Sequence, residues 1–89
     1  MHTIKDKSKF LTRVRRIQGQ VAALEKQLMN EGDCAAVLQQ IAAIRGAVNG
    51  LMGAVIEGHI TDHLINEPEL EKRQQDTDVI LQVIKSYLK

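Results

Sequence analysis

Apolar residues recur every three or four positions through most of the chain, which is the spacing of one face of an α-helix. In residues 6–30 these spacings alternate, so we predict a helix whose heptad seam packs against another helix. The seam consists of Phe10, Val14, Ile17, Val21, Leu24 and Leu28. We find no alternating strand pattern and predict an all-α protein.

A second, longer helix is predicted from Asp33 or Cys34 to about Leu64. Its apolar positions are Val37, Ile41, Ile44, Val48, Leu51 and Val55, and His59 continues the same face. The opposite face is rich in glycine and alanine, which permit close approach of another backbone. A helix with two apolar faces is usually central, so we expect its own subunit on one side and a second subunit on the other.

Turn-forming residues separate these elements. Between the first two helices, Gly32 is predicted to end one helix and Asp33 to cap the next. Pro68 interrupts the pattern within residues 66–70, because proline disfavours helix at the preceding residue. We predict that the third helix begins at Asp76 or Thr77 and runs to the end of the chain. The three helices form a single predicted domain, 1–89.

Length and composition narrow the class of protein. A subunit of 89 residues buries only a modest part of its apolar surface, so association is expected. The single cysteine excludes an intramolecular disulfide and suits a reducing compartment. We see no signal segment and expect no apolar run that approaches the length of a membrane span, so a cytoplasmic protein without a membrane partner is predicted.

Charge is unevenly distributed along the chain. The first 20 residues carry six basic residues and one acidic residue, whereas the remainder carries six basic and ten acidic residues. A basic arm on an acidic body suggests an anionic partner. With one Phe, one Tyr and no Trp, the stacking of nucleic-acid bases on aromatic rings is not an expected binding mode.

Helical angles place four residues of the basic arm in one stripe, Lys9, Arg13, Arg16 and Gln20, with Arg15 directed elsewhere. Such a stripe could lie on the phosphates of double-stranded DNA, with Gln20 or an arginine at a base edge. The alternative interpretation is a charged face that is simply solvated. The second helix is too long to be the recognition helix of a helix-turn-helix motif.

Three potential metal ligands share one face of the second helix but lie near its opposite ends. Cys34 is at the start, and His59 and His63 are near the end. At 1.5 Å per residue, Cys34 and His59 are separated by about 37 Å, so one subunit cannot close a site around all three. An antiparallel second copy would bring Cys34 of one chain beside both histidines of the other and build two equivalent sites.

Each of these residues also has a plain structural explanation. A histidine pair four residues apart can hold one ion, but it also arises by chance at an interface. Cys34 could be a small apolar residue at a helix start, or a thiolate favoured by the helix dipole. His2 could chelate a metal together with the amine of Met1, although terminal residues are commonly disordered. Mixed nitrogen and sulfur ligands suit Ni(II), Co(II) and Zn(II), and the lack of a second thiolate argues against a dedicated Cu(I) site.

Two runs of sequence resemble the CsoR/RcnR/FrmR family of all-helical bacterial transcriptional repressors. They are LTRVRRIQGQV at residues 11–21 and LQQIAAIRGAVNGLM at residues 38–52, and the region of Cys34 is similar too. The resemblance implies an antiparallel dimer that forms a four-helix bundle and doubles to a homotetramer. It also implies binding to operator DNA without a helix-turn-helix, and release when an effector binds between subunits.

The ligand pattern resembles most closely the nickel/cobalt-sensing RcnR branch of that family. This resemblance implies a metal site made of Met1 (through its amine), His2, Cys34, His59 and His63, and DNA contacts by Arg13, Arg16 and Gln20. Copper sensors have a second cysteine at the position of His63, and formaldehyde sensors have a proline at the N-terminus. The run RVRR at residues 13–16, which includes Arg15, is nearer to the formaldehyde sensors.

The sequence therefore predicts a metal-free repressor of an efflux gene that is released from DNA by Ni(II) or Co(II), with Zn(II) as a further candidate effector. Two alternatives stay open. One is a formaldehyde-responsive repressor that uses Cys34 and the N-terminal amine, and the other is a small metal carrier. An enzyme is not expected, because no carboxylate is clearly placed as a general base within the ligand cluster.

Overall fold

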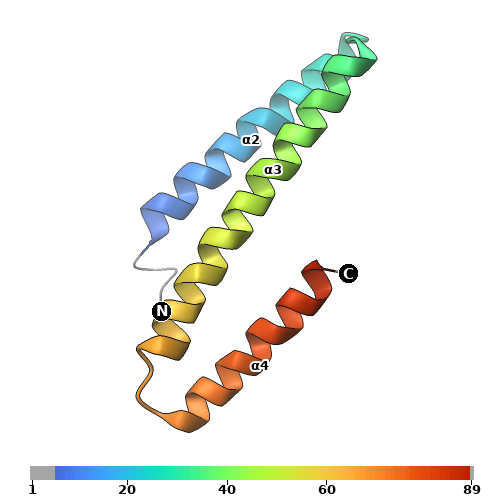
Figure 1. Ribbon diagram of the computed structural model, residues 1–89. Helices are drawn as coiled ribbons and strands as arrows, with labels where there is room; N and C mark the ends of the chain where they lie inside the picture. The colour runs from blue at the N-terminus through green and yellow to red at the C-terminus, as the bar shows by residue number, and fades with distance from the viewer. Residues whose placement is uncertain (1–5, 89) are drawn as a thin grey trace.

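The computed structural model describes residues 6–88, in which every regular element is helical. The elements in chain order are α2 (Lys7–Met29), α3 (Cys34–His59), the π-helical segment η1 (Ile60–Ile65) and α4 (Leu70–Tyr87). α2 and α3 form a long antiparallel hairpin, and α4 turns back along the second half of α3 (Figure 1). The all-α prediction is confirmed, and the predicted bounds of the first helix are right to within one residue.

The turn after α2 differs from the prediction in one respect. Glu31, not Gly32, adopts the left-handed backbone conformation, with φ of 53°. The N–H groups of Glu31 and Gly32 donate to the carbonyl oxygens of Leu28 and Gln27, at 3.3 and 2.6 Å. This is the Schellman arrangement that satisfies the last carbonyl groups of a helix. Gly32 is required for a different reason, because a Cβ atom there would lie 2.9 Å from the backbone oxygen of Gln27.

The start of α3 follows the sequence prediction. The Asp33 side chain accepts a 3.3 Å hydrogen bond from the backbone N–H of Ala36, which satisfies one of the unpaired donors at the helix N-terminus. The α-helical part of α3 ends at His59, and η1 continues it to Ile65 with the wider turn of a π-helix. Asn66 N–H donates to the oxygen of Thr61, five residues back, as that geometry requires. The long second helix is therefore present, with its last turn widened around His63.

The prediction for the third helix was wrong at its start. α4 begins at Leu70, six residues before Asp76. Pro68 does end the preceding segment, but Glu69 already has the extended conformation of a residue that flanks a helix start, with φ −87° and ψ 121°. The stretch that follows contains strong helix formers without an apolar repeat. Apolar spacing alone therefore could not detect the first turns of α4.

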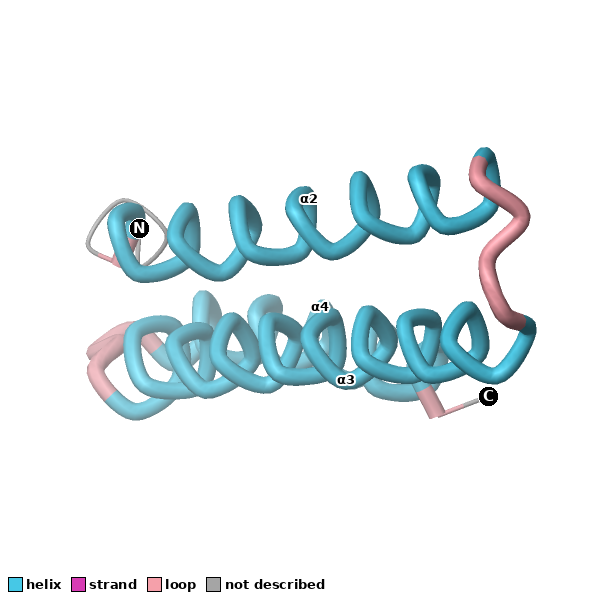
Figure 2. The backbone as a smooth tube through the Cα atoms, turned by 90° about the horizontal axis from the view of Figure 1, so that it is seen from above, coloured by secondary structure: helices cyan, strands magenta, loops and turns pink. Residues whose placement is uncertain are grey.

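The subunit is long and flat, with dimensions of 55 × 29 × 13 Å. Seen from above, α2 runs alongside α3, and α3 and α4 overlap in this view (Figure 2). Among residues 6–88, Ile80 is the one buried apolar side chain, and large apolar residues on all three helices stay exposed, including Ile41, Val48 and Val79. A single copy of this chain therefore leaves most of its apolar faces in contact with water.

The helix from Cys34 to Ile65 is long and apolar enough to cross a membrane, judged by length and composition only. The expectation that no apolar run approaches a spanning length is therefore wrong. The same test is passed by central helices of soluble proteins, so it is weak evidence for a membrane protein. No part of the apolar window is buried inside the single chain, although α2 and α4 both border this helix.

Candidate metal site and nucleic-acid interface

The structure brings His59 and His63 together at the end of α3. His59 is the last α-helical residue and His63 lies in η1, and both are half-buried. Their ring centroids are 4.7 Å apart and the rings are tilted by 39°. The predicted proximity of the two imidazoles is confirmed, and two nitrogen ligands for one metal ion are within reach of each other.

α4 supplies a residue that sequence reasoning did not assign to this site. The Asp76 carboxylate lies 3.4 Å from Nδ1 of His63, and the Asp76 backbone oxygen is 3.2 Å from Nε2 of His59. A carbonyl oxygen only accepts, so a hydrogen bond at the second contact requires the hydrogen on Nε2. The sequence pattern predicts Asp76 or Thr77 as the start of the third helix, whereas Asp76 lies on the second turn of α4, where it reaches the histidines. Carboxylates beside metal-ligating histidines orient the ring and raise its basicity.

Cys34 lies at the opposite end of the same helix. It is the first residue of α3, is exposed, and follows the capping residue Asp33. The 25 intervening steps correspond to about 37 Å between Cys34 and His59, along a molecule 55 Å long. Within the part of the chain that the structure describes, no three potential ligands of the His, Cys, Asp or Glu type form a metal-binding group. The structure thus places the cysteine and the histidine pair apart in one subunit. Met1 and His2 lie outside the described residues.

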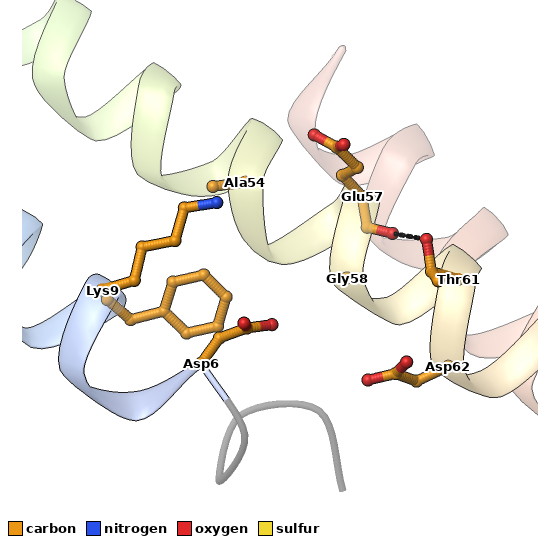
Figure 3. A pocket seen from close by; sticks show the side chains of 8 residues that line it. Asp6, Lys9, Ala54, Glu57, Gly58, Thr61 and Asp62 are labelled. Atoms are coloured by element: carbon orange, nitrogen blue, oxygen red, sulfur yellow. Dashed lines mark hydrogen bonds between the residues drawn. The ribbon is translucent and has the colours of Figure 1, made fainter.

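A small hollow of about 150 Å³ lies where the start of α2 meets the end of α3. Figure 3 shows Asp6 and Lys9 on one side of it and Glu57 and Asp62 on the other. Lys9 is therefore the one basic group among three carboxylates in its lining. The Thr61 hydroxyl donates to the backbone oxygen of Glu57 at 3.0 Å, which leaves the Glu57 carboxylate uninvolved in that bond.

The predicted basic stripe is on α2, but its members differ in their surroundings. Lys9, Arg15 and Arg16 are exposed, whereas Arg13 and Gln20 are half-buried against α3. The backbone oxygen of Gln20 accepts a 3.0 Å hydrogen bond from Nε2 of Gln40, and the Gln20 side-chain oxygen is buried without a hydrogen-bond partner. Lys9 and Arg16 are exposed on one face of α2, with the half-buried Arg13 between that face and α3, whereas Arg15 is exposed on another face.

Comparison with known proteins identifies the family. The family model described as a metal-sensitive transcriptional repressor matches residues 6–86. The chain belongs to this family. Among curated relatives, transcriptional repressor RcnR from Escherichia coli strain K12 and from Salmonella paratyphi B are each 58% identical over 88 residues, with 99% of this chain and 98% of the relative covered.

A solved structure also resembles this repressor along its whole length. It is a glutamate-to-histidine variant of the formaldehyde-responsive regulator FrmR from Salmonella enterica serovar Typhimurium. The TM-score is 0.90 and the identity 45%, over 98% of this chain and 99% of that one. The comparisons confirm the all-α fold and a role as a transcriptional repressor rather than an enzyme. A repressor acts on DNA, and the metal-sensitive family implies a metal effector.

Proposed function

We propose that this repressor binds operator DNA through α2 when metal-free and releases it when Ni(II) or Co(II) binds at a site shared by two subunits, so that a metal efflux gene is expressed. Zn(II) is the third candidate effector. The proposal places one repressor domain, residues 1–89, in the cytoplasm. The observation that carries it is the position of Cys34 at the start of α3 and of the His59–His63 pair at the opposite end, where α3 continues into η1.

A two-fold symmetric dimer would bring the separated cysteine and histidines together. If a second α3 lies antiparallel beside the first, Cys34 of each chain reaches the histidine pair of the other, and two equivalent sites form. The exposed apolar residues support such an assembly, because Ile41 and Val48 on α3 are 47% and 43% exposed in the single chain. Burying these faces is the main favourable contribution to association. We propose a dimer with a four-helix bundle at its centre, and a homotetramer built from two such dimers.

The donor set fits a borderline divalent ion. Cys34 supplies a thiolate and His59 and His63 supply imidazoles, and the proposal adds the amine of Met1 and the imidazole of His2. Mixed nitrogen and sulfur ligation favours Ni(II), Co(II) and Zn(II) over hard ions such as Mg²⁺. The name RcnR belongs to relatives that share 58% of their residues with this chain. Ni(II) and Co(II) are therefore the effectors we place first.

The proposed DNA surface is the exposed flank of α2. Lys9 and Arg16 are positioned to neutralise phosphates, and Arg13 and Gln20 lie at the border with α3. Arg15 is exposed on another face of α2 and would meet DNA only outside this stripe. Repetition by symmetry multiplies this positive field over several helical faces. Phosphate contacts of this kind give an affinity that falls steeply as the salt concentration rises.

Metal and DNA must oppose each other energetically. Linkage requires that an effector which weakens DNA binding is itself bound less tightly by the DNA complex. A coupling of about 1–3 kcal/mol changes DNA affinity roughly 5- to 150-fold. α4 offers a physical connection, since Asp76 contacts both histidines and Tyr87, near the other end of α4, donates a 2.6 Å hydrogen bond to Asn49 in the middle of α3. We propose that closing the metal site shifts the helices relative to one another and misplaces the basic groups of α2.

The experiment that tests the proposal is a DNA-binding titration of the metal-free protein with Co(II), Ni(II), Zn(II) and Cu(I). The probe is a duplex selected by the metal-free protein from a random-sequence pool. We expect Ni(II) and Co(II) to release the duplex, and we expect Cys34→Ala and His63→Ala to remove the response while metal-free binding is retained. An unchanged Ni(II) and Co(II) response in His63→Ala would contradict the proposed specificity.

A formaldehyde-responsive repressor is the second candidate. It is favoured by the 45% identity to FrmR and by the exposed thiol of Cys34 at a helix N-terminus, where the dipole favours the thiolate. Formaldehyde added to the metal-free protein in the presence of a chelator separates the two functions. Release of the duplex with a mass gain that requires Cys34 would support this candidate, and an unaffected complex would exclude it. A metal carrier would bind metal without salt-dependent binding to the duplex.

A further inference from the structure

One glycine of α3 is in contact with the basic stripe of α2. A methyl group built on Gly50 would lie 3.2 Å from Nη1 of Arg13 and would meet no other atom at ordinary contact distance in the described chain. Gly46 and Gly53 lie one turn before and after it, and a methyl group on either would meet nothing within 4 Å. Gly50 therefore differs from Gly46 and Gly53 in having the Arg13 guanidinium beside it.

The space at Gly50 is occupied by a charge. Arg13 is half-buried, so its stem covers part of the α2–α3 junction and its guanidinium lies at the rim, on the flank that also carries Lys9 and Arg16. Glycine inside a helix is destabilising relative to alanine. At Gly50 this cost is accompanied by a close approach of the guanidinium to α3, and an added methyl group would displace the guanidinium by a few tenths of an ångström.

The neighbouring residue of α3 is also held from the other side. Asn49 Oδ1 accepts the 2.6 Å hydrogen bond from the Tyr87 hydroxyl of α4. Two consecutive residues of α3 thus meet different helices, because Asn49 contacts α4 and Gly50 is approached by Arg13 of α2. The Arg13 guanidinium therefore lies beside a part of α3 that α4 also contacts.

We infer that Gly50 is a positioning residue for DNA recognition, because it leaves room for the Arg13 guanidinium at the rim of the α2–α3 junction, where the guanidinium can meet a phosphate or a base edge. The inference rests on the proposed DNA-binding function and names a residue that does not touch DNA itself. An arginine restrained before binding loses less side-chain freedom when it meets its partner. Its rigid fork of donors is also sensitive to small displacements.

The test compares Gly50→Ala with Gly46→Ala as the matched control. Both substitutions exchange glycine for alanine inside α3 and bring the same gain in helix propensity, so both proteins are expected to fold. We expect Gly46→Ala to bind the selected duplex like the parent. We expect Gly50→Ala to bind it about three- to tenfold more weakly, a part of what complete loss of a charged hydrogen bond costs. The salt dependence should also become less steep.

A double-mutant cycle assigns the effect to Arg13. In an Arg13→Ala background, Gly50→Ala should cause no further loss of DNA affinity. The Arg13 side-chain ¹⁵N signals of the metal-free protein should shift in Gly50→Ala and stay in place in Gly46→Ala, whether or not DNA is present. Oligomeric state, measured for every variant, should be unchanged.

The inference is overturned if Gly50→Ala and Gly46→Ala bind the duplex equally, if Gly50→Ala binds it more tightly, or if the loss persists without Arg13. Failure of the parent protein to bind any duplex would instead refute the proposed function. The two failures are therefore distinguishable. An unshifted Arg13 signal in Gly50→Ala would contradict the contact itself.

Discussion

Asp76 of α4 lies against His63 of η1, with its carboxylate oxygen 3.4 Å from Nδ1 of the imidazole. The contact is made while both side chains are partly exposed, at 31% and 25% of their area. A metal ion bound at Nε2 of His63 would leave this Nδ1 contact in place. Asp76 is therefore positioned to set the orientation of a ligand that the proposed site needs.

Asp76→Asn should weaken metal binding by about 10- to 100-fold, the usual cost of removing a carboxylate that supports a ligating histidine. The measurement is competition for Co(II) against a chelator of known affinity. Asp78→Asn is the control, because it removes the same charge from an exposed position on the same helix. Equal metal affinities for the two variants would show that Asp76 has no supporting role.

Tyr87→Phe should loosen the end of α4 without unfolding the protein. It removes the 2.6 Å hydrogen bond to Asn49, which is exposed and is expected to contribute about 0.5–1.5 kcal/mol. Hydrogen exchange should become faster at amides in the last turns of α4 and stay unchanged at the start of α2. In an Asn49→Ala background the substitution should have no added effect, and a full additional effect there would rule out this hydrogen bond as the cause.

Gly32→Ala should destabilise the protein by about 1–3 kcal/mol, as overpacking against a fixed backbone does. The added Cβ would lie 2.9 Å from the backbone oxygen of Gln27, which cannot move without disturbing the end of α2. Gly19→Ala is the matched control, since a methyl group there meets nothing within 4 Å. Its better helix propensity should stabilise α2 by up to about 1 kcal/mol.

Urea unfolding at a fixed subunit concentration measures both changes, because association contributes to the apparent stability. The opposite signs of the two effects are the informative result. If Gly32→Ala were as stable as Gly19→Ala, the close approach between residue 32 and Gln27 would not be a real constraint on the turn.

Much of this fold follows from periodicity. The seam from Phe10 to Leu28 predicted α2, and the uninterrupted apolar positions after Asp33 predicted one long central helix, because both signals repeat over many turns. The start of α4 was missed, since residues 71–75 form helix through intrinsic propensity and carry no apolar repeat. The widened turn η1 has no comparable sequence signal.

The site was predictable in part for the same reason. The pairing of His59 and His63 depends on spacing along one helix, which the sequence contains. The contact of Asp76 with this pair depends on how α4 folds back, and the approach of Arg13 to Gly50 depends on the distance between α2 and α3. Such tertiary distances are set by packing between elements, which spacing within an element does not specify.

The proposed intersubunit site has a direct test in mixed dimers. One chain carries Cys34→Ala and the other carries both His59→Ala and His63→Ala, and different affinity tags on the two chains allow the mixed dimer to be isolated. In a shared site, the intact Cys34 of the second chain meets the intact histidines of the first, so one of the two symmetric sites is restored.

The decisive measurement is the number of tightly bound Co(II) ions per dimer. The account predicts two for the parent dimer, none for either variant alone, and one for the mixed dimer. A mixed dimer that binds no Co(II) tightly, or a Cys34→Ala dimer that binds it like the parent, would contradict a site built from the opposite ends of two α3 helices.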